Sequence, residues 1–332
     1  MNKKAQDTRR KAQERPHKAG ATSVPCALCP VPIIFLVGPT AVGKSAVALE
    51  LARLLNGEII SCDAMQVYCE ATIATDRPSE EILKSISHHL LGMVSVEEEF
   101  NVALYRERVL KVVDDIGARH KTPIVCGGSG MYMMALLDGL LEGGAPDPEA
   151  RRRLEAEADQ KGLDALYRRL QKVDPGAAEK ITPADKGRII RALEVFESTG
   201  VPISTLQKTR EGLWGKYQIR IFCLDRERAE LYHRAEVRID EMFTRGLIDE
   251  VKALLQKKLT PTSARIIGVP ELRGYFSGEY SLDEAKELMK RNTRHYIKRQ
   301  LTWFRKDKRV EWIKIAPDAT AAGVADTIKR LI

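Results

Sequence analysis

The 332-residue sequence has no long apolar run and no framework of cysteines. No stretch approaches the roughly 18 consecutive apolar residues that a membrane-spanning helix needs, so we expect no membrane partner. The six cysteines are scattered, and Cys26 and Cys29 form a single C-x-x-C without a second pair, which is too few ligands for a zinc site. Thiols without a disulfide framework are typical of the reducing cytoplasm, where we expect the protein to act.

Positive charge is concentrated in two blocks of a chain whose net charge is +8. Residues 1–20 carry a net charge of +5 and residues 286–309 a net charge of +8. Such blocks favour a polyanionic partner. We interpret residues 1–30 as a basic, disordered tail. The alternative of a secretory signal peptide is disfavoured, because prolines interrupt the apolar run at the end of this segment. The second block is interleaved with aromatic side chains and is the better candidate for contact with nucleic acid.

Short apolar runs alternate with helical patterns in the first half of the chain. Ile33–Val37, Glu58–Cys62 and Ile124–Cys126 have the composition of buried parallel strands. Helical periodicity separates them over Ser45–Leu55 and Phe100–Ala118. This alternation predicts an α/β fold, with a P-loop NTPase-like parallel sheet flanked by helices.

The middle of the chain has a different character. Residues 146–205 are charged and helical with no strong strand, whereas Ile219–Leu224 predicts another strand, followed by a long helix over Glu227–Lys257. The simplest architecture is a catalytic core of residues 31–145 and 206–332, interrupted by an all-helical insertion domain of residues 146–205.

A phosphate-binding loop stands between the first strand and its helix. The pattern G-x-x-x-x-G-K-[ST] is matched at every position by Gly38, Pro39, Thr40, Ala41, Val42, Gly43, Lys44 and Ser45. The glycines let backbone N–H groups converge on phosphate oxygens, and Lys44 supplies a positive charge. Ser45 can hold Mg²⁺, which is the cofactor we expect.

The strand ends that follow this loop bear on the reaction class. Ile124–Cys126 runs into Gly-Gly-Ser-Gly, without the carboxylate that P-loop nucleotide hydrolases use to organise magnesium and water. This absence disfavours an ATPase and leaves room for a ligand whose diphosphate is the leaving group. Asp63 follows the second strand and should stand at the same sheet edge. By position alone it could be a magnesium ligand, a helix cap or a general base.

Several segments together resemble one family, the tRNA dimethylallyltransferases of the bacterial type. The matching segments, in order, are Gly38–Ser45, Asp63–Tyr68, Ile73–Pro78, His88–Leu90, Gly127–Tyr132, Arg188–Val195, Arg238 to Val251, Gly268 and Arg299–Arg305. They span roughly residues 33–313. The phosphate loop alone is widespread, but its combination with D-x-x-Q-V-Y, R-x-x-R-A-L-E and R-Q-x-T-W is highly specific.

The resemblance implies a reaction. A dimethylallyl group would pass from dimethylallyl diphosphate to N6 of the adenine 3′ of the tRNA anticodon, giving N6-dimethylallyladenosine and diphosphate. Asp63 would be the base that takes the N6 proton. Thr40 and Arg238 would stabilise the departing diphosphate, next to the loop Gly38–Ser45.

The resemblance also implies how the partner is held. The helical insertion resembles the family's domain that clasps the anticodon stem-loop, and we expect a monomer. Two stretches would contact tRNA: Asp63, Ala64, Met65 and Gln66, and Arg188, Ile189, Ile190, Arg191 and Ala192. Ala64 stands where the family usually has Ser, Ser129 replaces Thr and Val269 replaces an aromatic residue; Ala74 also departs from the pattern. These departures leave the reaction class intact and bear on substrate preference.

Other functions use the same phosphate loop. An adenylate isopentenyltransferase that accepts AMP, ADP or ATP would not need the basic block or the Arg188/Arg191 pair. A P-loop small-molecule kinase would need the magnesium-binding carboxylate that the later strand lacks. A non-catalytic RNA-binding protein leaves Asp63 and the complete phosphate loop without a role.

Four residues also have plainer interpretations. An aromatic residue beside Leu301, such as Trp303, is more typical of a core than of a base-stacking site. His88 and His89 are more typical of local hydrogen bonding than of metal ligation. Without the resemblance, Arg238 would be interpreted as a surface partner of acidic residues on its own helix.

Overall fold

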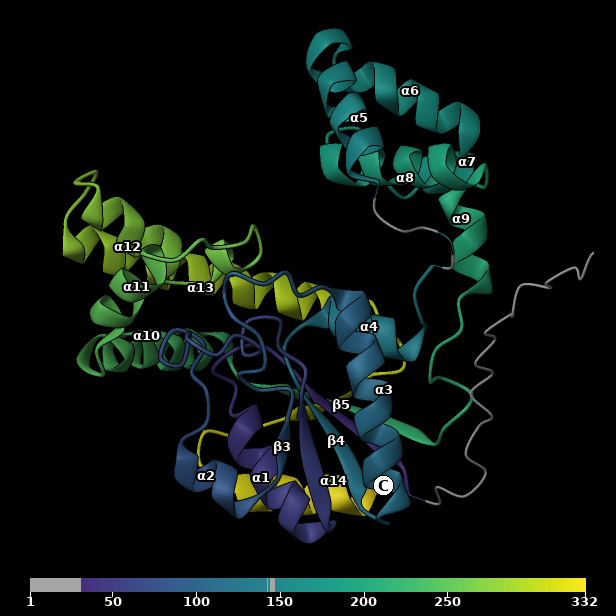
Figure 1. Cartoon of the computed structure of the whole chain (residues 1–332). Helices are drawn as coiled ribbons and strands as arrows, with labels where there is room; N and C mark the ends of the chain where they lie inside the picture. Colours follow the sequence, from purple (N-terminus) through teal and green to yellow (C-terminus); the bar gives the residue numbers. More distant parts are fainter. Residues whose placement is uncertain (1–30, 142, 144–146) are drawn as a thin grey trace, which may run out of the picture.

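The computed structural model describes residues 31–141, 143 and 147–332 (Figure 1). The basic tail predicted over residues 1–30, together with residues 142 and 144–146, lies outside the described residues. Within that described part of the chain, no helix combines the length and the apolar character needed to span a membrane.

One parallel sheet of six strands, ordered β3-β2-β4-β1-β5-β6, organises the core. The strands are β1 (Ile33–Val37), β2 (Gly57–Ser61), β3 (His88–His89), β4 (Thr122–Gly127), β5 (Ile219–Asp225) and β6 (Glu311–Lys314). Every residue of β1 is buried, as expected for a central strand covered on both faces. The chain order reverses between β1 and its neighbour β4, and ligands of open α/β sheets bind outside the carboxyl ends of strands at such a point.

Helices cover both faces of this sheet. Those of the core are α1 (Lys44–Leu54), α2 (Glu80–Ser85), α3 (Val102–Ala118), α4 (Gly130–Leu137), α10 (Arg228–Thr244), α11 (Leu247–Leu255), α12 (Val269–Phe276), α13 (Leu282–Phe304) and α14 (Ala321–Leu331), with the 3₁₀ turn η2 (Ser263–Arg265). Alternate residues of β1 face different layers: Ile34 and Leu36 pack in an apolar cluster with α1 and α14, and Phe35 and Val37 in one with α3 and α4.

The parallel sheet and its flanking helices were predicted correctly from the sequence. Several elements differ. The short strands β3 and β6 were not predicted. The long helix predicted over Glu227–Lys257 is two helices, α10 and α11, because the chain turns at Gly246, where φ is 97°. Glycine adopts this left-handed backbone conformation without the steric cost that other residues meet.

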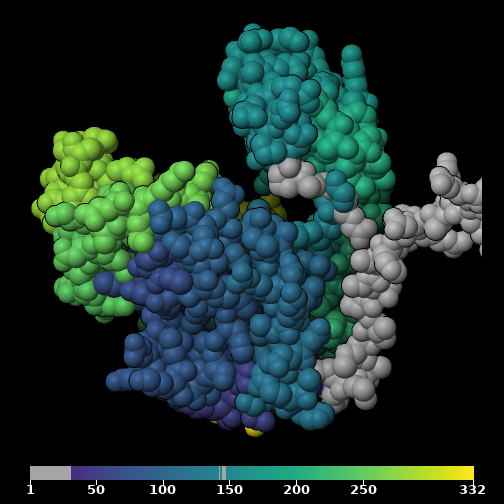
Figure 2. All heavy atoms as spheres, viewed as in Figure 1, coloured from purple at the N-terminus to yellow at the C-terminus, as the bar shows by residue number. Residues whose placement is uncertain are grey.

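The middle of the chain forms a separate helical layer (Figure 1). Its elements are α5 (Pro148–Lys161), α6 (Leu163–Val173), α7 (Pro175–Ala178), α8 (Lys186–Thr199), α9 (Ile203–Leu206) and the 3₁₀ turn η1 (Gln207–Thr209). These helices pack around an apolar cluster of their own, with Leu166, Leu170 and Leu193 fully buried. Figure 2 shows this layer rising from one side of the core.

The two connections to the helical layer are held together at their base, which we call the neck. Arg106 of α3 donates from Nε to Ala135 O at 3.1 Å and from Nη2 to Glu211 O at 3.0 Å, so one side chain binds the outgoing and the returning segment. A Cβ atom at Gly212 would lie 2.1 Å from Leu137 O. The two segments therefore approach more closely than any other residue at that position allows.

Candidate active site

The phosphate loop connects β1 to α1, as the sequence predicts. A Cβ atom at Gly38 would lie 2.8 Å from Leu224 O of β5, so only glycine lets the loop pass this close to the sheet. Gly43 caps α1 in the left-handed region, with φ at 105°. The Lys44 ammonium donates to Pro39 O at 2.7 Å, across the mouth of the loop.

Helix α10 lies along the phosphate loop and contacts it through arginines. Arg234 Nε donates to Ala41 O at 3.0 Å. One turn later, Arg238 donates from Nη2 to the Thr40 hydroxyl and lies with Nη1 3.4 Å from the Asp76 carboxylate. The interpretation of Arg238 as a surface partner of acidic residues on its own helix is therefore wrong. Its Nε is buried and has no hydrogen-bond partner among the described residues.

Lys44 is the half-buried lysine of the site and lines the cavity. Burial lowers the pKa of Lys44 from its ordinary value, while the nearby Asp63 carboxylate raises it and the Arg238 guanidinium lowers it. These contributions place one carboxylate and two cations in a single electrostatic neighbourhood. An anion bound at the loop would favour the charged form of Lys44.

Asp63 follows β2 and is held by the backbone. Its Oδ1 accepts a hydrogen bond from Met65 N at 2.9 Å, which fixes the orientation of the carboxylate. No residue in the described ranges donates a hydrogen bond to Oδ2. The neighbouring Ala64 N donates to Ser129 Oγ at 3.1 Å, so the loop after β2 is tied to the loop after β4.

Gln66, predicted to contact tRNA, makes contacts within the protein. Its Oε1 accepts from the Ser61 hydroxyl at 3.0 Å, and its Nε2 donates to Thr75 O at 3.2 Å. The side chain thus joins β2 to the segment that carries Asp76. Both polar atoms of the Gln66 side chain are therefore already hydrogen-bonded within the protein.

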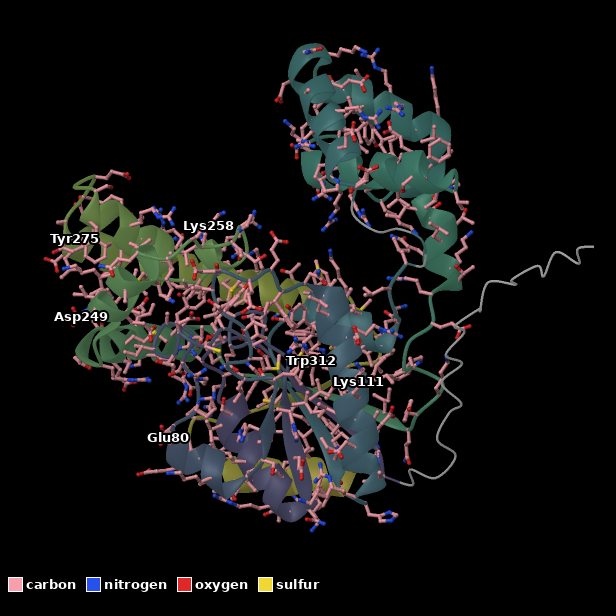
Figure 3. The ribbon with its side chains drawn as sticks, in the orientation of Figure 1. Glu80, Lys111, Asp249, Lys258, Tyr275 and Trp312 are labelled. Atoms are coloured by element: carbon pink, nitrogen blue, oxygen red, sulfur yellow. The ribbon has the colours of Figure 1, made fainter. Side chains whose placement is uncertain are left out.

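These groups line a cavity of about 840 Å³ at the carboxyl ends of the strands. Figure 3 shows the side chains that crowd the part of the core where α10 and α13 meet the sheet. The polar and charged residues lining it include Thr40, Lys44, Ser45, Asp63, Gln66, Asp76, Arg234, Arg238, Tyr296 and Arg299. Ala41 and Gly43 also line it, whereas Gly38, Pro39 and Val42 are buried. The volume is that of a site for a small organic ligand.

Gln300 lies in the segment Arg299–Arg305 that carries the resemblance, but no site role was predicted for it. Its Oε1 accepts from Thr40 N at 2.9 Å and its Nε2 donates to Gly128 O at 3.0 Å. A Cβ atom at Gly128 would lie 2.1 Å from that Nε2, so a larger residue there would displace the Gln300 amide. Gln300 falls inside the basic block of residues 286–309, but nothing in its spacing could show a contact 260 residues away.

The second predicted tRNA stretch lies on α8 and is only partly accessible. Arg188 is exposed, with 65% of its side chain accessible, and Arg191 lies 3.1 Å from the buried carboxylate of Glu194. Three members of the stretch are buried in the apolar cluster of the helical layer: Ile189, Ile190 and Ala192. The prediction that this whole stretch faces RNA is corrected accordingly, because only its arginines reach the surface.

The structure confirms the plainer interpretation of the two histidines and contradicts that of Trp303. His88 Nδ1 lies 2.8 Å from Ile86 O and His89 Nε2 lies 2.8 Å from the Glu58 carboxylate, which confirms local hydrogen bonding. Among the described residues there is no group of three or more His, Cys, Asp or Glu side chains that could hold a metal. The core interpretation of Trp303 is wrong, because 38% of this residue is exposed where its ring covers the start of α4.

Comparison with known proteins places the chain. The model of the family described as IPP transferase matches residues 66–307. The chain belongs to this IPP transferase family. Curated relatives include tRNA dimethylallyltransferase 2 of Geotalea uraniireducens, 43% identical over 286 residues, which are 86% of this chain and 92% of that protein. The tRNA dimethylallyltransferase of Heliobacterium modesticaldum is 44% identical over 84% of this chain and 88% of its own length.

Solved structures of the same family share the fold. The tRNA isopentenylpyrophosphate transferase of Bacillus halodurans superposes with a TM-score of 0.66 at 36% identity, covering 90% of this chain and 96% of that one. A eukaryotic dimethylallyltransferase acting on tRNA superposes with a TM-score of 0.77 at 28% identity, covering 90% and 79%. The family resemblance and the fold class inferred from the sequence are thereby confirmed.

Proposed function

We propose that this protein transfers a dimethylallyl group from dimethylallyl diphosphate to N6 of the adenine 3′ of the anticodon in tRNA. The products are N6-dimethylallyladenosine and diphosphate. The observation that carries this proposal is one cavity that contains both a carboxylate, Asp63, and a cationic phosphate site built from Thr40, Lys44 and Arg238. Relatives at 43% and 44% identity over most of the chain carry the name tRNA dimethylallyltransferase.

The acceptor half of the reaction rests on Asp63. The exocyclic amine of adenine is a poor nucleophile and loses a proton as its bond to the prenyl carbon forms. A carboxylate in position to take that proton contributes about 10²–10⁴-fold. The backbone bond from Met65 N holds Oδ1, and Oδ2 accepts no hydrogen bond from the described residues, so it is available to a ligand in the cavity that Asp63 lines. The target base stacks within its loop, so it enters the cavity by flipping out of that stack.

The leaving-group half rests on the phosphate loop. As the bond between the prenyl carbon and the diphosphate oxygen breaks, its electron pair goes to the diphosphate, and negative charge grows on the departing oxygens. Three groups supply preorganised donors for that charge: the Thr40 hydroxyl, the Lys44 ammonium and the Nε of Arg238, which is buried and has no partner among the residues that the structure describes. Removing one such donor typically costs about 10²–10³-fold in rate.

Magnesium fits this site as a partner of the diphosphate. Ser45 is exposed and lines the cavity, and its hydroxyl would hold the ion together with diphosphate oxygens. The ion would neutralise charge on the leaving group. Because the described residues include no cluster of three carboxylate, imidazole or thiol ligands, water and substrate would supply the remaining oxygens, as is usual for Mg²⁺.

The tRNA partner is the anticodon stem-loop. We infer that it binds between the cavity and the helical layer of residues 148–206, with Arg188 on one side and the basic face of α13 on the other. The same proposal includes a monomeric enzyme that acts in the cytoplasm. Light scattering of the protein with and without RNA tests the first of these statements, and cell fractionation tests the second.

Transfer to defined acceptors tests the proposal. Purified protein with Mg²⁺ and dimethylallyl diphosphate is incubated with an anticodon stem-loop RNA, with AMP and with ATP, and nucleosides are analysed by mass spectrometry after digestion. We expect a five-carbon gain on the loop adenine only, lost in Asp63→Ala. Transfer to AMP instead would identify an adenylate isopentenyltransferase. ATP turnover with no transfer would contradict the proposal and indicate a kinase.

A further inference from the structure

Asp76 joins two arginines at the wall of the cavity. Its Oδ2 lies 3.4 Å from Arg238 Nη1 and its Oδ1 lies 3.2 Å from Arg245 Nη1. Arg238 and Asp76 both line the cavity. One carboxylate is therefore shared between an arginine that faces the phosphate loop and a second arginine outside it.

The segment that carries Asp76 is built to hold this position. Glu250 of α11 accepts four hydrogen bonds from it: from Thr72 N at 2.9 Å, Thr72 Oγ1 at 2.8 Å, Ile73 N at 2.8 Å and Ala74 N at 2.8 Å. Gln66 binds the same segment through Thr75 O. Asp76 itself has φ at 51°, a left-handed conformation that Asp and Asn tolerate better than most residues. The carboxylate is thus placed by a fixed backbone.

The placement has an electrostatic consequence for any anion at the loop. A diphosphate bound by Thr40 and Arg238 would bring its negative charge close to the Asp76 carboxylate. The two anions compete for one guanidinium, and like charges at this separation repel. Asp76 therefore weakens the hold of Arg238 on diphosphate.

We propose that Asp76 is a competing counter-ion for Arg238 that lowers the affinity of the site for diphosphate and so promotes release of the product. This inference rests on the proposed function, because it takes diphosphate as the leaving group. Arg245 limits the effect by sharing the carboxylate. In the product complex the guanidinium turns back from diphosphate to Asp76, which restores the ion pair seen in this structure.

Binding of inorganic diphosphate tests the inference directly. Isothermal titration calorimetry compares the wild-type protein with Asp76→Asn, which keeps the side-chain shape and the left-handed backbone while removing the charge. We expect Asp76→Asn to bind diphosphate about fivefold more tightly, the range of a partly exposed ion pair. The gain should shrink as salt is raised. Product inhibition of prenyl transfer by diphosphate should strengthen by the same factor.

A second variant acts in the opposite direction. Arg245→Gln leaves Asp76 to Arg238 alone, so diphosphate binding should weaken by about threefold. The matched controls are Glu236→Gln and Arg294→Gln, which break an ion pair of similar exposure between α10 and α13 without altering the pair at the cavity. Both controls should bind diphosphate like the wild type.

Several outcomes would overturn the inference. These are unchanged or weaker binding by Asp76→Asn, unchanged or tighter binding by Arg245→Gln, or equal shifts in the two controls, which would show a general charge effect. The proposed function fails separately. A wild-type protein that binds diphosphate but transfers no prenyl group contradicts that function, whereas one that transfers the group while Asp76→Asn binds no tighter contradicts only the role of Asp76.

Discussion

Two carboxylates at opposite ends of β2 are treated very differently by the fold. Glu58, near the amino end, is 2% exposed and is bound by Arg119, Lys121 and His89. Asp63, just past the carboxyl end, has one oxygen bound by a backbone N–H and lies in a cavity among cations. The same strand thus carries a carboxylate that is fully paired and one that is left available.

The difference separates stability from chemistry. Hydrogen bonding from Arg119, helped by Lys121 and His89, holds the pKa of Glu58 well below its usual range in spite of burial, so this carboxylate is ionised and saturated. Such a group stabilises the fold and has no capacity left for a ligand. At the other end Arg238 Nε is buried without a partner in the described chain, and such incomplete pairing is typical of functional sites.

The largest expected effect breaks the available end. Asp63→Asn keeps the shape of the side chain and the bond from Met65 N but removes the base. We expect kcat for prenyl transfer to fall by about 10²–10⁴-fold, with the melting temperature unchanged. Single-turnover kinetics measure the loss. Retention of more than a tenth of the activity would show that another group takes the proton.

The next effect concerns the shape of the cation. Arg238→Lys keeps a positive charge but cannot contact Thr40 and Asp76 at once or place a donor where Nε lies. We expect a fall in kcat/KM of about 10²-fold, mostly in kcat, because the lost donors act on the charge that develops in the transition state. Initial rates at saturating RNA measure the split. A change confined to KM would assign Arg238 to ground-state binding alone.

The paired end should respond in stability only. Glu58→Gln removes the charge that Arg119 and Lys121 bind, and we expect a loss of about 1–3 kcal/mol in the free energy of unfolding with activity of the folded enzyme unchanged. Urea denaturation measures the loss, and Glu107→Gln, an exposed partner of Lys111, is the matched control with little expected effect.

The pH dependence of that loss has a defined sign. Because folding lowers the pKa of Glu58, its contribution is complete above the unfolded-state value of about 4.3 and is lost as pH falls below it. The difference in unfolding free energy between wild type and Glu58→Gln should therefore stay constant down to that value and shrink as the solution is acidified further. A difference that stays constant below that value as well would mean that folding does not lower the pKa of Glu58.

The smallest expected effect concerns the helical layer, away from both ends of β2. Arg188→Ala on α8 should weaken binding of the stem-loop RNA by a few-fold, and lower the dependence of binding on salt concentration by about one counterion. Diphosphate binding should be unchanged. Filter binding at several salt concentrations measures both quantities, with the exposed Arg168 of α6 replaced by Ala as the control. Equal effects of the two replacements would remove α8 as a preferred contact.

Local patterns were sufficient for much of the fold and for part of the site. The phosphate loop and Asp63 follow directly from strand ends, because ligand-binding loops of a parallel sheet lie where strands finish. By contrast, β3 and β6 are strands of two and four residues, too short for periodicity to show. Gln300 and Asp76 lie in the segments Arg299–Arg305 and Ile73–Pro78 that carry the resemblance, but no role was predicted for either, because each acts through a partner far away in sequence.

Burial on α8 shows a different limit. The segment Arg188–Ala192 was matched as a whole, but on a helix only some of five consecutive residues can face outward. Arg188 and Arg191 lie three residues apart and share one side, while Ile189 and Ile190 are buried on the other. The helical period is therefore needed to tell which residues of a matched segment are exposed and which are buried.

The neck at Arg106 makes the helical layer a removable module. Since Ala135 O and Glu211 O are bound by the same guanidinium, the two ends of the insertion are held close together, and the length of the segment between them adds little to the entropy cost of closing it. A short turn in its place would preserve the sheet and the phosphate loop. During evolution, such a junction allows a helical RNA-binding insertion to be gained, enlarged or replaced without a change in the diphosphate-binding core.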